Sequence, residues 1–306
     1  MNKDSVYWKQ VQLLVRILPL IDTEACFALK GGTAINLFYR PLPRLSVDID
    51  LMYLPLEGRE SAIPNIHAAL HRIAELIRER IRDSHVEEVF EESDSLRLNV
   101  ELDHVRIKIE LSPVTRGSIY HPVKMHVVAE VEKEFGYAEM LVSAFPDLFA
   151  GKLCAGLDRQ HPRDLFDILG MYQNEGFTEE LRKAFMVFLI SHYRPMAELL
   201  NPHRIDLSGS FKSEFLQMTR ENISLKTLEE TREKLIHDIN LQLTADERQF
   251  IYLFKSKKPD WTLLGLPNAD EISQLPAVRW KMINLEKLEE KKHIAALEKL
   301  KLVLNI

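Results

Sequence analysis

The chain has 306 residues, of which 46% are hydrophobic and 28% charged, and it carries a net charge of −6. This composition is typical of a globular protein with one large domain or two, and its acidity excludes a general attraction to nucleic acid or anionic membranes. The two cysteines, Cys26 and Cys154, are too few for a disulfide framework or a cysteine-rich zinc site, and they suit a reducing compartment.

The N-terminal region predicts a helix rather than a targeting segment. Met1–Ser5 lacks the basic and apolar parts of a signal peptide. Leu14, Leu18 and Ile21 recur at helical spacing, which predicts a helix over Val6–Ile21. The sequence contains no run of roughly 18 apolar residues, the length that a bilayer-spanning helix needs. We therefore expect a cytoplasmic protein that makes no membrane contact.

A glycine pair interrupts the chain after this helix. Gly31 and Gly32 break the helical pattern, and Thr33 begins a short helical segment that is ended by Pro41 and Pro43. The free N–H groups of a helix N-terminus are therefore expected directly after a flexible turn.

The segment Val47–Leu54 alternates between apolar and acidic residues, which is typical of a strand with one buried face. Its apolar side chains are those of Val47, Ile49 and Leu51. Asp48 and Asp50 point the other way, so that their carboxylates share a face, about 7 Å apart along the chain. The strand is therefore expected to present two acids on its open side.

One more helix and three more strands are expected before residue 130. An amphipathic helix is predicted by an apolar stripe that consists of Ile66, Leu70, Ile73 and Ile77. Leu96–Leu102 and Val105–Leu111 both alternate, and Asp103 and His104 between them fit a two-residue hairpin turn. A further strand is expected around Val123–Val128.

From about Glu132 onward the pattern predicts helices alone. The expected helices run from Pro146 to Leu157, Arg163 to Tyr172, Leu181 to Tyr193, Leu225 to Leu241 and Leu275 to Leu304. The sequence therefore predicts an α+β protein with two domains. Residues 1–135 would form a lobe with a small mixed sheet, and residues 136–306 an all-helical lobe.

The paired acids Asp48 and Asp50 are suited to binding a divalent metal ion. Parallel carboxylates hold hard cations such as Mg²⁺ or Mn²⁺, which also bind triphosphates. Glu110 lies on the polar face of the strand Val105–Leu111, and pairing of that strand with Val47–Leu54 would bring it near both aspartates. There it would share a metal ion or act as a general base toward an acceptor hydroxyl.

The glycine turn supplies the phosphate-binding half of such a site. Gly31 and Gly32 permit close approach of the backbone, and the helix that starts at Thr33 attracts anions through its free N–H groups and its dipole. Lys30 adds a positive charge, and Thr33 adds a hydroxyl group. A loop of about 14 residues joins this turn to Asp48, so the two halves are able to face each other.

These residues carry a resemblance to a known family. The segments Lys30–Ala34 and Arg44–Leu51 resemble the AbiEii/MenT-like nucleotidyltransferase toxins of the polymerase-β-like superfamily. The chain departs from the usual pattern in the longer link through Pro41-Leu42-Pro43 and in having Glu110 where many members of the superfamily have aspartate.

The resemblance implies a polymerase-β-like lobe that binds a nucleoside triphosphate (NTP) with Mg²⁺ or Mn²⁺ and transfers the nucleoside monophosphate to an acceptor hydroxyl. Asp48, Asp50 and Glu110 would be the catalytic metal ligands. Ser46 would orient Asp48 or contact a phosphate oxygen, and Arg44 would contact phosphate or support the loop.

A second match lies in the helical region. Lys152-Leu153-Cys154-Ala155, Arg159 and Arg163–Ile168 are similar to the family's Lys-Leu-X-Ala and Arg-Asp-Leu-X-Asp segment. Lys152 is expected to bind the β- or γ-phosphate, and its alternative is a lysine whose stem lies on the surface.

The resemblance also implies that Asp164 or Asp167 serves the site, and we prefer Asp164 as the catalytic residue. Arg163 and Asp167 would then assist nucleotide binding. The alternative is that both aspartates interact with the positive end of their helix.

The family further implies the toxin of a type IV toxin–antitoxin system, a transfer-RNA 3′ end or another RNA as acceptor, and a cognate antitoxin encoded nearby whose direct binding is left open. An RNA acceptor needs a basic surface, for which the candidates on one predicted helix are Arg72, Arg78, Arg80 and Arg82. Two alternatives remain: a nucleotidyltransferase that modifies an antibiotic-type small molecule, and a nucleotide-binding module that has lost turnover.

Overall fold

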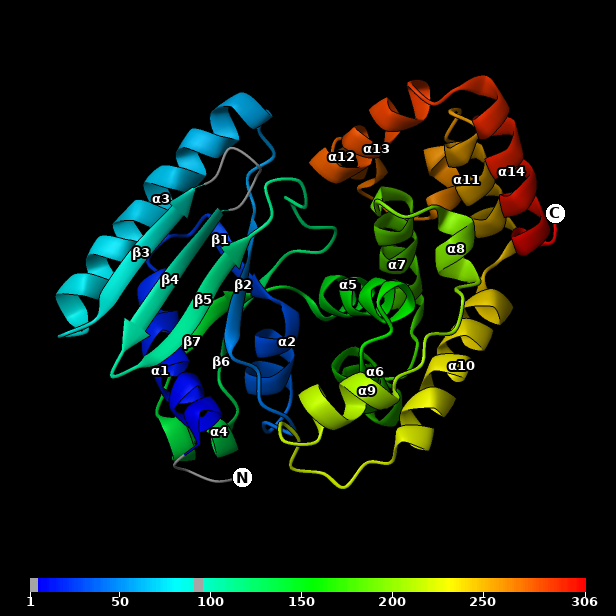
Figure 1. The fold of residues 1–306 in the computed structure, drawn as a ribbon. Helices are drawn as coiled ribbons and strands as arrows, with labels where there is room; N and C mark the ends of the chain where they lie inside the picture. Colours follow the sequence, from blue (N-terminus) through cyan, green and yellow to red (C-terminus); the bar gives the residue numbers. More distant parts are fainter. Residues whose placement is uncertain (1–4, 91–95) are drawn as a thin grey trace. The chain divides into compact units, whose positions relative to one another are not determined.

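The computed structural model describes residues 5–90 and 96–306 of the chain (Figure 1). It divides into two compact units, each described here by itself. The sheet unit comprises Met1–Ala144 with Gln217–Asn222, and the helical unit comprises Phe145–Leu216 with Ile223–Ile306. Separate folding of residues 1–135 and 136–306 as domains stays a proposal, which expression of the two segments on their own would test.

The sheet unit contains a seven-stranded sheet with the order β3-β4-β5-β2-β1-β7-β6. Its strands are β1 (Phe27–Lys30), β2 (Asp48–Tyr53), β3 (His85–Phe90), β4 (Leu96–Leu102), β5 (Val105–Leu111), β6 (Val123–His126) and β7 (Glu139–Val142). β2 pairs with β5 and β1 pairs with β7 in parallel, whereas the other neighbours are antiparallel. The protein is therefore α+β with a mixed sheet, as predicted.

Four helical segments accompany the sheet: α1 (Val6–Ile21), α2 (Gly31–Ala34) continued by a π-helical turn (Ile35–Tyr39), α3 (Arg59–Arg80) and α4 (Ala129–Phe135). α1 contacts β5 and β7, and α3 contacts β3 and β4 (Figure 1). The apolar side of β5 is buried, whereas Arg106 and Lys108 on its other side are exposed. The sheet therefore has one apolar face under α1 and α3 and one polar face.

The hairpin of β4 and β5 forms as the sequence predicts. Leu102 pairs with Val105, and the two turn residues Asp103 and His104 have φ angles of 50° and 64°. Positive φ at both positions is the requirement of a type I′ turn, whose twist matches that of the flanking strands. This turn fixes the register that carries Glu110 to its place.

The prediction that only helices follow Glu132 is wrong, because β7 lies at Glu139–Val142 and pairs with both β1 and β6. The sequence analysis also missed β1, β3 and α4. β1 is four residues long and its first three are fully buried, so it has no alternation by which to recognise it.

The segment Gln217–Asn222 returns from the later part of the chain to the loop before β2. The backbone N–H of Leu45 donates to the carbonyl of Met218 at 2.7 Å, and Arg44 forms a β-bridge with Thr219. Arg220 pairs with Glu134 at 2.7 Å. These contacts hold the loop that leads directly into Asp48.

The helical unit contains α5 (Phe145–Asp158), α6 (Pro162–Asn174), α7 (Glu179–Ser191), α8 (Met196–Leu200), α9 (Ser208–Ser210) with a π-helical turn (Phe211–Phe215), α10 (Leu225–Gln242), α11 (Ala245–Lys255), a 3-10 turn (Trp261–Leu264), α12 (Ala269–Ser273), α13 (Pro276–Glu286) and α14 (Glu290–Leu304). α5 packs against α6 and α7. The single helix expected over Leu275–Leu304 is wrong, because the chain breaks between Glu286 and Glu290 into two helices.

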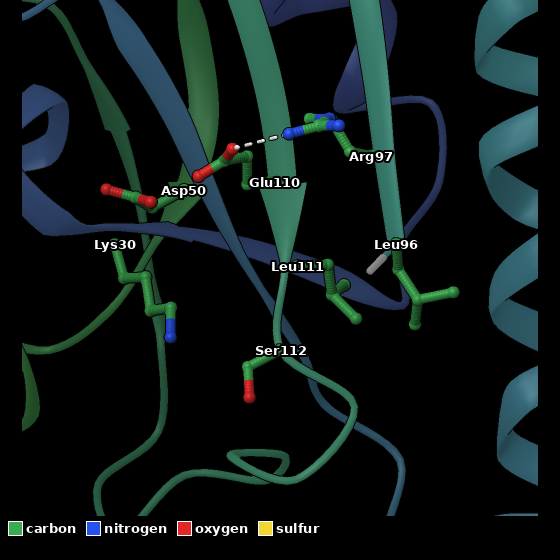
Figure 2. A pocket seen from close by; sticks show the side chains of 7 residues that line it. All are labelled: Lys30, Asp50, Leu96, Arg97, Glu110, Leu111 and Ser112. Carbon is green, nitrogen blue, oxygen red and sulfur yellow. Dashed lines mark ion pairs between the residues drawn. The ribbon is translucent and has the colours of Figure 1, made fainter. Parts of the chain in front are cut away.

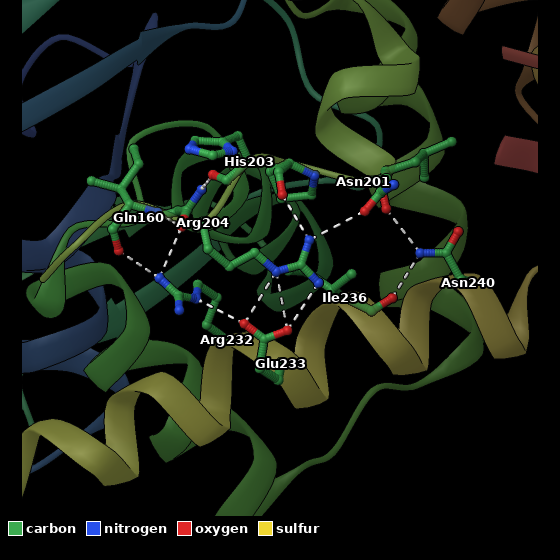
Figure 3. A network of polar contacts seen from close by, with 11 residues as sticks. Gln160, Asn201, His203, Arg204, Arg232, Glu233, Ile236 and Asn240 are labelled. Carbon is green, nitrogen blue, oxygen red and sulfur yellow. Dashed lines mark hydrogen bonds and ion pairs between the residues drawn. The ribbon is translucent and has the colours of Figure 1, made fainter. Parts of the chain in front are cut away.

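A polar network ties the loop after α8 to α10 (Figure 3). The guanidinium of Arg232 is buried and donates to Gln160 at 3.1 Å and to the carbonyl of Ile205 at 2.8 Å. Arg204 pairs with Glu233 at 2.9 Å. Because these donors have partners, the buried arginine stabilises the loop that links α8 to α9.

Among the described residues, no helix combines the length and the apolar character needed to cross a lipid bilayer.

Candidate active site

β2 places Asp48 and Asp50 on the polar face of the sheet. Ile49 and Leu51 between and beyond them are fully buried, whereas both aspartates are half-buried. β2 has β1 on one side and β5 on the other. The two acids therefore have neighbours on both flanking strands.

Glu110 lies directly opposite Asp50 in the parallel pairing of β2 and β5. Its side chain is 43% exposed, so the carboxylate remains open to a ligand. The neighbourhood expected from the sequence is present in the structure. The same register places Lys108 opposite Asp48, which adds a cation beside the first acid.

A pocket of about 310 Å³ opens over this row of residues (Figure 2). Its lining residues are Lys30, Asp50, Leu96, Arg97, Glu110, Leu111 and Ser112. The volume is at the small end of the range for ligand sites. Of the residues that the sequence linked to metal and phosphate, Lys30, Asp50 and Glu110 therefore share one cavity, whereas Asp48 is not among its lining residues.

Lys30 is the cross-strand neighbour of Asp50 in the antiparallel pairing of β1 and β2. Burial lowers the pKa of the Lys30 amine, while the Asp50 carboxylate acts in the opposite direction. The Nζ atom lies 3.5 Å from the hydroxyl of Thr115. Lys30 is thus a half-buried amine that lines the pocket beside the acids, in a position to contact an anionic ligand.

The glycine turn is packed against the two acids. Gly31 has a φ angle of 74°, and a Cβ atom at this position would overlap the carboxylate of Asp50. A Cβ at Gly32 would lie 2.7 Å from the guanidinium of Arg44 and 2.8 Å from the hydroxyl of Ser46. Both glycines are therefore required by close approach, and at Gly31 the backbone conformation requires glycine as well.

Thr33 is fully buried and serves the strand that carries Asp48. Its hydroxyl bonds to the carbonyl oxygen of Asp48 and to the Ser46 hydroxyl at 3.1 Å. The Asn36 side chain donates to the carbonyl of Gly32 at 2.8 Å. The hydroxyl that the sequence analysis expected to face a phosphate therefore connects α2 to β2, and the backbone of α2 is left as the candidate anion contact.

A second cluster lies in the helical unit, between α5 and α6. The Nζ of Lys152 is 2.8 Å from Asp164 and 3.0 Å from Asp167, and all three side chains are at least 92% buried. Arg159 also pairs with Asp164, at 2.5 Å. The alternative of a snorkelling surface lysine is wrong, because the amine is buried between two carboxylates.

The charge balance of this cluster explains how it stays ionised. Burial raises the pKa of Asp164, but the charges of Lys152 and Arg159 lower it by more than burial raises it. The pKa of Asp164 therefore lies well below its usual range. Arg163 is half-buried, and its backbone N–H donates to His161 Nδ1 at 3.1 Å at the start of α6. Lys152, Arg159, Asp164 and Asp167 of the second match are thus gathered in one cluster.

The arginines proposed as a basic surface each have an acidic neighbour. Arg72 pairs with Glu24 at 2.6 Å and Arg78 with Glu88 at 3.1 Å, while Arg80 and Arg82 lie 3.5 Å and 3.8 Å from neighbouring acids. Arg82 also lies beyond the end of α3. Because α3 packs under the apolar face of the sheet, this helix does not supply the expected basic surface beside the acids.

The donor set fits a hard divalent cation. Within residues 5–90 and 96–306 no three His, Cys, Asp or Glu side chains converge into a ready-made metal site. Mg²⁺, however, commonly binds one or two carboxylates and takes its remaining ligands from substrate phosphates and water. Asp48 and Asp50 on one strand face, with the carboxylate of Asp50 in the space left by Gly31, suit that mode of binding.

Sequence reasoning missed Arg97 and Ser112 as pocket residues. Arg97 lies opposite Glu110 in the pairing of β4 and β5, and its Nη1 is 3.9 Å from Glu110 Oε1 (Figure 2). Its position on the polar side of the alternating segment Leu96–Leu102 was a usable signal. However, the sequence does not give the order of the strands, so it could not show that this face of β4 lies near Asp50.

Two comparisons with known proteins gave matches. The model of the family described as nucleotidyl transferase AbiEii toxin, type IV toxin–antitoxin system, matches residues 12–282. A solved structure of the nucleotidyltransferase toxin MenT4 from Mycobacterium tuberculosis is similar in fold, with a TM-score of 0.63 and 15% sequence identity over 96% of this chain and 93% of that chain. A search of curated proteins found no match. Because the family model covers most of its length, the chain belongs to the AbiEii nucleotidyltransferase toxin family of type IV toxin–antitoxin systems.

Proposed function

We propose that the chain transfers a nucleoside monophosphate from an NTP to an acceptor hydroxyl at the pocket of Asp50 and Glu110. The observation that carries this proposal is the packing of three elements at one point. Gly31 at the start of α2 leaves no room for a side chain beside Asp50, and Glu110 lies opposite Asp50 on β5. The glycine turn is therefore packed against Asp50, which lines one cavity together with Glu110.

The phosphates of the NTP would bind on the α2 side of the acids. The free backbone N–H groups of Gly31, Gly32 and Thr33 attract anions at the start of the helical segment. The amine of Lys30 lines the pocket beside Asp50 and would add a positive charge. The triphosphate is thereby oriented with its leaving group toward this turn.

Transfer would proceed as an in-line displacement at the α-phosphorus. The acceptor oxygen forms a bond to this phosphorus while the bond to the bridging oxygen of the β-phosphate breaks, and pyrophosphate leaves with the electron pair. Glu110 would take the proton of the attacking hydroxyl, since its carboxylate is open to the pocket. Asp48 and Asp50 would hold Mg²⁺ or Mn²⁺, which supplies charge neutralisation to the phosphates when bound.

The buried cluster of Lys152, Asp164 and Asp167 would support the same reaction. We propose Asp164 as the residue that fixes the amine of Lys152, because it contacts both Lys152 and Arg159. Lys152 would direct its charge to the β- or γ-phosphate, and Arg163 and Asp167 would assist nucleotide binding. The family membership supports this assignment through the matching motif.

The acceptor would be the 3′ end of a transfer RNA or of another RNA, and the protein would act in the cytoplasm. A cognate antitoxin encoded nearby would counter the activity, with or without direct contact. Incubation of the purified protein with each α-³²P-labelled NTP, Mg²⁺ or Mn²⁺ and total RNA tests the proposal. One NTP should label RNA of a defined size, and a complete lack of labelling under all conditions would contradict it.

A further inference from the structure

Four charged side chains lie in one row across the polar face of the sheet. The register places Lys30 on β1 beside Asp50 on β2, Asp50 beside Glu110 on β5, and Glu110 beside Arg97 on β4. Figure 2 shows these side chains around the pocket. The pocket therefore has an acidic centre and a cation at each end.

The Arg97 guanidinium is only loosely held by residues 5–90 and 96–306. Its contact with Glu110 is 3.9 Å long, which is beyond hydrogen-bond distance. Its Nε atom is buried and has no hydrogen-bond partner within residues 5–90 and 96–306. By contrast, Arg72 holds Glu24 with two hydrogen bonds of 2.6 and 2.8 Å. Arg97 thus keeps donors that a ligand in the pocket could satisfy.

Arg97 lies at the end of the row that is remote from the phosphate-binding turn. Three strand spacings separate β1 from β4, which amounts to roughly 14 Å. In an in-line displacement the attacking oxygen arrives opposite the leaving group. Since pyrophosphate would leave toward α2, the acceptor must approach from the side of Glu110 and Arg97.

We propose that Arg97 binds a phosphate group of the acceptor, next to the hydroxyl that reacts. This inference rests on the proposed function and adds a requirement to it: the acceptor carries a phosphate within about one nucleotide of its hydroxyl. The last phosphodiester of an RNA strand with a free 3′ hydroxyl has this chemistry. Arg97 is then the residue that selects such a strand end over an uncharged hydroxyl compound.

Kinetics of Arg97→Gln against a matched control test the proposal. The control is Arg106→Gln, because Arg106 lies on the same face of the neighbouring strand but is 58% exposed and paired with Glu101. With a short single-stranded RNA oligonucleotide as acceptor, Arg97→Gln should raise the acceptor KM roughly tenfold to a hundredfold. The KM of the NTP should hardly change, and Arg106→Gln should behave like the wild type in both.

An acceptor whose last phosphate linkage is uncharged tests the contact with Arg97 without any change to the protein. Replacing the last phosphodiester of the oligonucleotide by a methylphosphonate should weaken wild-type binding by a similar factor. The same replacement should have little further effect on Arg97→Gln, since the contact is already lost. If the methylphosphonate weakened binding to Arg97→Gln by the same factor as binding to the wild type, the proposal would be overturned. An unchanged acceptor KM with a lower kcat in Arg97→Gln would also overturn it, because Arg97 would then serve to hold Glu110.

Failure of the proposed transfer reaction can be distinguished from failure of the Arg97 contact. In that case the wild-type protein would transfer nothing, so binding of the fluorescently labelled oligonucleotide is also measured without NTP. Weaker binding of Arg97→Gln than of Arg106→Gln there would still support the contact. Equal binding of both variants would overturn it.

Discussion

Asp50 on β2 and Glu110 on β5 are direct neighbours in a parallel pair of strands, with Lys30 on the far side of Asp50 and Arg97 on the far side of Glu110. Two like charges are thus placed side by side between two cations. Flanking cations offset the electrostatic repulsion between the two carboxylates, and a bound divalent cation would offset it further.

Glu110→Gln tests the role of the second acid of this pair. The amide cannot take a proton from the acceptor, so kcat should fall by roughly a hundredfold or more, while the affinity for the NTP changes little. The measurement is single-turnover transfer together with equilibrium nucleotide binding. Glu101→Gln on the neighbouring strand is the matched control and should retain wild-type kcat; a wild-type rate in Glu110→Gln would contradict the assignment.

Gly31→Ala tests the close approach of α2 to Asp50. The added methyl group would overlap the Asp50 carboxylate, and the positive φ angle is unfavourable for alanine. We expect a loss of about 1–3 kcal/mol in the free energy of unfolding together with loss of transfer.

Gly136→Ala separates the two causes in this experiment. Gly136 has a φ angle of 96° but open space around its Cβ position, so this variant measures backbone strain alone and should retain transfer. Full activity of Gly31→Ala would show that Asp50 does not need its present position.

Lys152→Met tests the buried cluster of the helical unit. The substitution leaves Asp164 and Asp167 buried without the amine between them, so urea unfolding should show a loss of about 3–5 kcal/mol. The exposed Lys226→Met should change little. Adding Asp164→Asn and Asp167→Asn to Lys152→Met should recover part of the loss, and no recovery would argue against the ion pairs as its cause.

The pKa of Asp164 gives the cluster a defined pH dependence. Although burial raises it, Lys152 and Arg159 hold the pKa of the folded protein below that of the unfolded chain. The resulting stability is fully present above the unfolded pKa of about 3.9 and is lost as the pH falls further. Below about pH 4 the free energy of unfolding should therefore fall more steeply in the wild type than in Asp164→Asn. Parallel curves from urea unfolding at a series of pH values would contradict this.

The elements that the sequence predicted well are those with one buried face. The alternation in Val105–Leu111 follows from burial of every second side chain, and in Leu96–Leu102 the apolar residues Leu96, Leu98 and Val100 are buried in the same way. The acids Asp48 and Asp50 stand out because they occupy the polar positions of such an alternation. Local pattern was therefore enough to find β2 and β5.

What the sequence could not supply is the order of the strands. β1 is a central strand buried on both faces, so Phe27–Leu29 lacks any period, and the pairing of Lys30 with Asp50 depends on it. The same holds for Arg97, whose distance from Asp50 is set by two strand pairings. The break between α13 and α14 was missed because Leu275–Leu304 keeps apolar residues at helical spacing across the turn.

The most direct test of the central claim is the single-turnover rate of transfer from a labelled NTP by Asp50→Asn, beside Asp103→Asn as the matched control. Asp103 lies in the hairpin turn at a φ angle of 50°, which asparagine also adopts readily. Asp50→Asn should lose at least about a hundredfold in rate with an unchanged melting temperature, while Asp103→Asn should remain at the wild-type rate. A wild-type rate in Asp50→Asn would contradict it.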